Sequence, residues 1–158
     1  TPRNILGAPI RTRWMAGAPN PSGKGKIPGI TPAQLDWSAE DIASRVGVRV
    51  ITLGAKGARV EREGQVPVVV TVPAEDTKAD PTGVGDAFRA GFLAGIAWGL
   101  SDERAAQVGA LLATYVVETV GTQEYAFTAE AFVARFAQAY GDDAGAEIAP
   151  QVSASARG

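Results

Sequence analysis

Residues 80–90 read D-P-T-G-V-G-D-A-F-R-A, and they are the most informative part of this 158-residue sequence. Their small residues stand at the start of an apolar stretch with helical character. We therefore expect the backbone N–H groups of Gly83, Val84 and Gly85 to project from a helix N-terminus, where they can bind an anion. Asp86 falls in the same turn. This combination suits phosphoryl transfer to an alcohol, because the N–H groups stabilise charge on the phosphate while the carboxylate accepts the hydroxyl proton.

The sequence before this turn predicts a strand and a hairpin. Residues 48–53 (V-R-V-I-T-L) read as a buried strand, and residues 54–57 (G-A-K-G) as a tight turn. Residues 57–62 and 65–72 then form a hairpin, in which Pro67 keeps the second strand near an edge of the sheet.

The sequence after the turn predicts three helices. They run from residue 84 to about 99, from a Ser101 cap to about 120, and from a Thr128 cap to 140, where Gly141 ends the last one. A capping box also predicts a short helix at residues 38–46. A strand, a hairpin and then packed helices indicate the α/β class.

The two glycine motifs together resemble a known family. D-P-T-G-V-G-D is similar to the C-terminal signature of the ribokinase-like, or PfkB-type, sugar and nucleoside kinases, and residues 52–57 (T-L-G-A-K-G) resemble that family's ATP-contacting turn. The longer run at residues 80–93, with G-T-Q-E-Y at residues 121–125, is most similar to bacterial adenosine kinases of the actinobacterial type. The resemblance covers residues 36 to about 148. It implies the C-terminal half of a ribokinase-like three-layer α/β/α fold.

This resemblance implies a role for each residue of the two motifs. Asp86 would be the base that deprotonates the acceptor hydroxyl group, and the N–H groups of Gly83, Val84 and Gly85 would hold the transferred phosphate. ATP and Mg²⁺ are the implied cofactors, and a nucleoside, adenosine first, or a sugar is the implied substrate. The implied nucleotide-binding residues are Thr52, Leu53, Gly54, Ala55, Lys56, Gly57 and Gly85. Without the resemblance, Asp86 has an equally good interpretation as a carboxylate that interacts with the helix dipole.

Three positions near the signature call for comment. The family more often has Thr and Ala where this chain has Pro81 and Val84, but neither change removes a group that the chemistry needs, since Val84 keeps its N–H. Asp80, with carbonyl groups near Thr82 and Gly121, matches a monovalent-cation site for K⁺ in some relatives. The alternative is an aspartate that caps a turn, and we favour this interpretation slightly.

The composition excludes several other kinds of chemistry and partner. The chain has no Cys and no His, so disulfides, thiolate metal sites and imidazole bases are excluded. It has no run of 18 apolar residues that could span a membrane. Five basic residues precede Asp36, but they are too widely spaced for a nucleic-acid footprint. We therefore expect a cytoplasmic protein without membrane or nucleic-acid partners.

The sequence also predicts three parts along the chain. Residues 1–35 form a basic Pro/Gly-rich leader, disordered or foreign to the family, because residues 1–32 hold six of the ten prolines and no acidic residue precedes Asp36. Residues 36–148 form the partial kinase domain. Residues 149–158 form a flexible tail, with no regular structure expected after Asp142.

Parts of the family pattern are missing from this sequence. They include the lid, the residues that hold the sugar, and the N-x-x-E motif associated with Mg²⁺. A parallel sheet that is cut midway exposes an edge, so we expect the isolated chain to self-associate. Two functions remain open at this point. One is an ATP-dependent kinase, and the other is a truncated, catalytically silent nucleotide-binding fragment or pseudo-kinase module.

Overall fold

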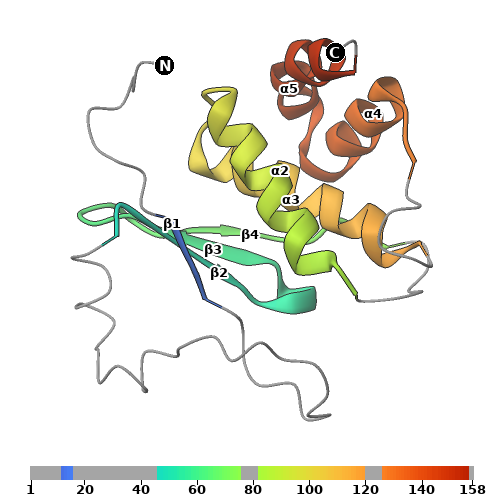
Figure 1. Ribbon diagram of the computed structural model, residues 1–158. Helices are drawn as coiled ribbons and strands as arrows, with labels where there is room; N and C mark the ends of the chain where they lie inside the picture. Colours follow the sequence, from blue (N-terminus) through green and yellow to red (C-terminus); the bar gives the residue numbers. More distant parts are fainter. Residues whose placement is uncertain (1–11, 16–45, 76–81, 120–125, 157–158) are drawn as a thin grey trace. The chain divides into compact units, whose positions relative to one another are not determined.

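The first half of the chain builds a four-stranded sheet with the strand order β1-β2-β3-β4 (Figure 1). The structure is a computed structural model that describes residues 12–15, 46–75, 82–119 and 126–156. The chain divides into two compact units, residues 1–69 and residues 70–158. The strands are β1 (Thr12–Met15), β2 (Val48–Thr52), β3 (Ala58–Glu61) and β4 (Val68–Val70).

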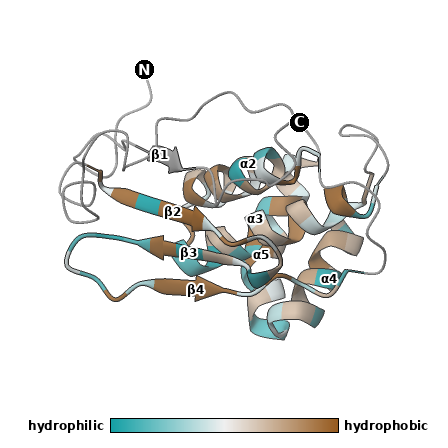
Figure 2. Ribbon diagram, turned by 90° about the horizontal axis from the view of Figure 1, so that it is seen from below, coloured by the Kyte–Doolittle hydropathy of each residue, from teal (hydrophilic) through white to brown (hydrophobic). Residues whose placement is uncertain are grey.

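Strands β2 and β3 form the predicted strand and the first arm of the predicted hairpin. They pair antiparallel, from Arg49 opposite Glu61 to Thr52 opposite Ala58. Their apolar side chains alternate with polar ones, as expected for strands with one buried face, and Figure 2 shows the apolar residues along β2, β3 and β4. The buried members are Val48, Val50, Ala58 and Val60. On the other face, Nη1 of Arg49 donates to Oε2 of Glu61 at 3.2 Å.

Strand β1 lies in the part of the chain for which the sequence predicts no regular structure. Residues 12–15 pair parallel with β2, from Thr12 opposite Val48 to Met15 opposite Ile51. The prediction of a leader without packed structure is therefore wrong for these four residues. Four residues among prolines are too short a run for apolar periodicity to indicate a strand.

In the described residues of its second half the chain forms four helices, two of which begin at side-chain caps. They are α2 (Val84–Ala97), α3 (Asp102–Val117), α4 (Ala129–Tyr140) and α5 (Asp142–Ser155). Ser101 Oγ accepts a hydrogen bond from the N–H of Arg104 at 3.2 Å, and Thr128 Oγ1 accepts one from the N–H of Ala131 at 3.1 Å. The two predicted caps are confirmed. The helix predicted at residues 38–46 lies outside the described residues.

Two contacts hold these helices together. Helices α2 and α3 approach closely at glycines, because a Cβ built on Gly91 would lie 2.7 Å from the Cα of Gly109. The second contact is a core that α3, α4 and α5 share, in which Leu111, Phe136 and Ile148 are fully buried. Each large apolar side chain buried in this way stabilises the fold by roughly 1.5–3 kcal/mol.

Helix α5 occupies the stretch for which the sequence predicts no regular structure. Its buried residues Ala144, Ile148 and Val152 recur every four positions, which is the spacing of one helix face. Ala144 is small, Val152 is only moderately large, and Pro150 interrupts the pattern. The apolar periodicity is therefore weak in the sequence. Of the helices in the described ranges, each is too short or too polar to cross a membrane.

Candidate active site

The N-terminus of α2 brings together the residues expected to bind an anion. Gly83 is the residue before the helix and has φ of 83°, a left-handed conformation that glycine adopts at no steric cost. The first helical hydrogen bond runs from the N–H of Ala87 to the carbonyl of Gly83, at 2.9 Å. The N–H groups of Gly83, Val84 and Gly85 come before it, and none of them donates to another described residue. The three N–H groups lie at the positive end of the helix dipole.

Asp86 lies in the first turn of α2, with a side chain that is 82% exposed. Its Oδ1 accepts a hydrogen bond from Nη1 of Arg89 at 2.7 Å, one turn further along the helix. The space beside Gly85 is also open, because no described residue lies within 4 Å of a Cβ built there. A substrate hydroxyl group can therefore reach the carboxylate, as a general base requires.

The buried face of α2 explains why its first turn stays exposed. The helix buries Ala87, Phe88, Gly91, Phe92 and Gly95. These residues follow the three- and four-residue spacing of one helix face, so the remaining face, with Asp86, is left to solvent. The glycine contact with α3 fixes the axis of α2, and with it the direction of the three N–H groups.

The turn at residues 52–57 is exposed and internally hydrogen-bonded. It contains a short 3₁₀ helix, Gly54–Lys56, and both Gly54 and Gly57 have positive φ, at 61° and 96°. The N–H of Leu53 donates to the carbonyl of Gly57 at 2.8 Å, and the N–H of Gly57 donates to the carbonyl of Gly54 at 3.0 Å. Leu53, Gly54, Ala55 and Lys56 are exposed, whereas Thr52 is half-buried and Gly57 is buried. The turn therefore presents its tip and the Lys56 ammonium group to solvent.

The two predicted parts of the site belong to different compact units. The turn at residues 52–57 lies in the unit of residues 1–69, and the start of α2 lies in the unit of residues 70–158. Asp80 and residues 121–125 lie outside the described residues, so the monovalent-cation site stays a prediction. Within the described ranges, no group of three or more Asp, Glu, His or Cys side chains could hold a metal ion.

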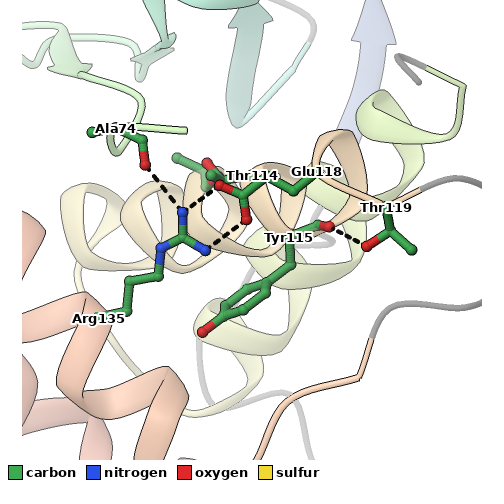
Figure 3. Close-up of polar contacts among 7 residues, drawn as sticks. Ala74, Thr114, Tyr115, Glu118, Thr119 and Arg135 are labelled. Atoms are coloured by element: carbon green, nitrogen blue, oxygen red, sulfur yellow. Dashed lines mark hydrogen bonds and ion pairs between the residues drawn. The ribbon is translucent and has the colours of Figure 1, made fainter. Parts of the chain in front are cut away.

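Neither Arg89 nor Arg135 was predicted from the sequence to be a site residue. Arg89 follows Asp86 by three positions, a spacing at which helical side chains meet, so its ion pair could have been predicted. Arg135 gives no such signal. Its guanidinium group binds Glu118 and the carbonyl of Ala74, which are 17 and 61 positions away in the sequence (Figure 3).

Helix α4 also contributes two side chains with altered acidity. The hydrogen bonds from Arg135 to Glu118 raise the pKa of the guanidinium group further above its ordinary value. Burial raises the pKa of Tyr140, whose hydroxyl group donates to the carbonyl of Thr71 at 2.9 Å. Arg135 therefore remains a cation and Tyr140 remains a neutral donor at ordinary pH.

Comparison with known proteins identifies the family. The model of the pfkB family carbohydrate kinases matches residues 23–129, so this chain belongs to that family. The match begins within the segment of residues 1–35 that the sequence sets apart from the family. The described elements are accordingly a part of the ribokinase-like α/β fold.

Nucleoside kinases are among the similar proteins. A nucleoside kinase of Methanocaldococcus jannaschii is 34% identical over 89 residues, which cover 56% of this chain and 29% of that protein. The structure of the Burkholderia thailandensis nucleoside kinase in complex with inosine has a TM-score of 0.67 and 34% identity, over 70% of this chain and 37% of that one. An inositol 3-kinase of Zea mays is 40% identical over 76 residues, covering 48% of this chain and 20% of that protein. The chain thus spans about a third or less of the length of these kinases.

One short similarity lies outside the kinases. A diheme cytochrome c-type protein of Cereibacter sphaeroides is 67% identical over 43 residues, which cover 27% of this chain and 14% of that protein. Covalent haem attachment in c-type cytochromes uses Cys and His side chains. This chain has neither residue type, so the shared segment cannot attach a haem in that way here.

Proposed function

We propose that this chain supplies the phosphoryl-transfer centre of an ATP-dependent kinase. The acceptor is a primary hydroxyl group of a nucleoside, with adenosine the first candidate, or of a sugar. One observation carries the proposal: the exposed carboxylate of Asp86 lies in the same helical turn as three N–H groups that no described residue occupies. The membership of the chain in the pfkB family supports it.

The residues at the start of α2 divide the chemistry between them. The Asp86 carboxylate accepts the proton of the acceptor hydroxyl group as its oxygen attacks the γ-phosphorus of ATP. The N–H groups of Gly83, Val84 and Gly85 stabilise the charge on the transferred phosphoryl group. Arg89 orients this carboxylate by donating to its Oδ1 at 2.7 Å.

The turn at residues 52–57 is proposed to bind the nucleotide. Its two glycines let the backbone turn sharply and leave room for close approach of a ligand. Lys56 adds a positive charge beside the backbone N–H groups. Mg²⁺ bound to ATP would supply further charge neutralisation on the phosphate oxygens.

The nucleoside is favoured over the sugar because of the similar proteins. Two of those reported above are named nucleoside kinases, and the Burkholderia structure was determined with inosine. A similar protein is named inositol 3-kinase, which keeps a cyclic polyol among the possible acceptors. Adenosine, ribose and the fructose phosphates are therefore the acceptors to compare.

A coupled assay of ADP formation tests the proposal with these acceptors side by side. The substitution Asp86→Asn removes the base and keeps the size of the side chain, so kcat should fall by about 10²–10⁴-fold. Asp143→Asn is the matched control, since Asp143 is also an exposed carboxylate in the first turn of a helix. If Asp86→Asn keeps its activity within a few-fold of the unaltered chain, Asp86 is not the base.

The second candidate function is a catalytically silent nucleotide-binding fragment. The chain covers only 37% and 29% of two of the related kinases, so the larger part of each of those proteins has no counterpart in the matched residues. Isothermal titration with a non-hydrolysable ATP analogue distinguishes the two functions. Binding without turnover of any acceptor supports the silent fragment, and binding with turnover supports the kinase.

A further inference from the structure

Helix α4 holds the segment of residues 71–75 by its backbone. This segment follows β4, and Ala74 stands nine positions before Gly83 in the sequence. Nη2 of Arg135 donates to the carbonyl of Ala74 at 3.0 Å, and the Tyr140 hydroxyl group donates to the carbonyl of Thr71 at 2.9 Å. Two side chains of one helix thus fix the segment at two points.

The same arginine also holds the C-terminal end of α3. Nη1 of Arg135 donates to Oε2 of Glu118 at 2.7 Å, and Nη2 donates to Oε1 at 2.5 Å. The side chains of Arg135 and Glu118 are only 18% and 13% exposed, so this two-point ion pair is largely shielded from solvent. Figure 3 shows the guanidinium group between Glu118 and the carbonyl of Ala74.

Aromatic packing restricts the guanidinium group further. Its central carbon lies 4.9 Å from the centre of the Tyr115 ring, a distance typical of a cation–π contact. Tyr115 packs against Phe132 with ring centres 5.9 Å apart, and Phe136 packs against Tyr140 at 4.9 Å. Arg135 and Tyr140 are therefore anchored to the helical core rather than placed on a mobile surface.

We propose that Arg135 is a positioning residue, which with Tyr140 fixes residues 71–75 and, through Glu118, the end of α3, the helix against which α2 packs. The inference rests on the proposed function only for the effect on turnover. The fixing of residues 71–75 rests on the hydrogen bonds that Arg135 and Tyr140 donate. A planar arginine fork is required, because it must reach a carboxylate and a carbonyl at the same time.

The first test measures backbone ¹⁵N relaxation in the full chain. Arg135→Met keeps an unbranched stem and removes the donors, so the order parameters of Thr71 and Ala74 should fall from about 0.85 to below about 0.6, while those in the middle of α3 stay near 0.85. Tyr140→Phe is a milder variant that loses one hydroxyl group and should affect Thr71 more than Ala74. Arg135→Lys should lie between the unaltered chain and Arg135→Met.

Arg104→Met is the matched control. Arg104 also joins two helices through a carboxylate, since its Nε donates to Glu147 at 2.8 Å, but its recorded contacts do not include residues 71–75. The inference is wrong if Arg135→Met leaves the order parameters of residues 71–75 unchanged. It is also wrong if Arg104→Met lowers them as much as Arg135→Met does.

The second test uses kinetics where the chain turns over a substrate. Arg135→Met should lower kcat at least 10-fold and change the KM for ATP less than 3-fold, whereas Arg104→Met should leave both within 3-fold. Equal changes of kcat in the two variants would contradict a positioning role. If the unaltered chain shows no turnover, the kinase proposal fails, and the relaxation experiment still decides whether Arg135 positions this segment.

Discussion

The substitution Gly91→Ala tests whether the close contact of α2 with α3 determines where the start of α2 lies. A Cβ at this position would lie 2.7 Å from the Cα of Gly109 and 3.0 Å from the carbonyl oxygen of Val108. Carbon atoms that are not bonded pack best at about 3.5–4.0 Å. The neighbours are backbone atoms of a regular helix, so no side chain can rotate away. The two helices must therefore separate by up to about 1 Å.

Two opposing terms set the size of the effect. An added methyl group in a helix stabilises the chain by roughly 0.5–1 kcal/mol relative to glycine. Overpacking of a well-packed interface typically costs about 1–3 kcal/mol, and a gap of 0.5–1 Å forfeits a quarter to a half of each dispersion contact beside it. We therefore expect a net loss of about 1–2 kcal/mol in the free energy of unfolding.

Urea denaturation followed by circular dichroism at 222 nm measures this loss. The signal reports on the helical unit, because α2, α3, α4 and α5 all lie in residues 70–158. With a slope of about 2 kcal/mol per molar urea, the midpoint should fall by about 0.5–1 M. Gly85→Ala is the control, since no described residue lies within 4 Å of its added Cβ, and it should be neutral or stabilising. An unchanged midpoint for Gly91→Ala would refute the packing argument.

Three further substitutions in α4 and its cap probe stability. Thr128→Ala removes the side-chain acceptor of the Ala131 N–H and should cost about 1 kcal/mol, which Thr128→Ser should restore in a urea titration. Phe136→Ala empties a fully buried position and should cost roughly 3–5 kcal/mol, unless the core collapses onto the cavity. Burial raises the pKa of Tyr140 above its value of about 10 in the unfolded chain. The contribution of this hydroxyl group to the free energy of unfolding is therefore complete below about pH 10. It falls as the pH rises toward the pKa in the folded chain, by up to about 1.4 kcal/mol per pH unit. Tyr140→Phe should lose that part of the alkaline pH dependence, and equal slopes above pH 10 would contradict the assignment.

The elements that the sequence predicts well are those with local signals. The starts of α3 and α4 follow from Ser101 and Thr128, each of which caps the N–H group three residues ahead. Gly141 ends α4 with φ of 100°, a conformation that favours glycine. The predicted α2 runs to about residue 99, whereas the helix ends at Ala97. Gly99 follows it with φ of 77°, and the N–H of Leu100 donates to the carbonyl of Gly95 at 3.0 Å, so the predicted glycine closes the helix from just outside it.

The elements that the sequence does not predict depend on partners far away in the chain. Strand β1 consists of four residues whose pairing with β2 spans more than thirty positions, and no local pattern encodes such a register. Helix α5 is held by small residues, and a Cβ on Gly145 would lie 2.6 Å from the Cβ of Ala137 in α4. From the sequence alone, such a glycine is interpreted as a flexible residue, although in the structure it allows two helices to pack closely.

The candidate site shows both kinds of information side by side. Its chemical groups are local in the sequence, since Gly83, Val84, Gly85 and Asp86 are consecutive. The order of these residues is therefore enough to predict N–H donors beside a carboxylate. Its placement is not local, since the axis of α2 depends on Gly109 of α3. A residue remote in the sequence can therefore reduce activity without touching a substrate. Variants that alter turnover but not nucleotide binding should thus occur on α3 and α4 as well as in the glycine turn.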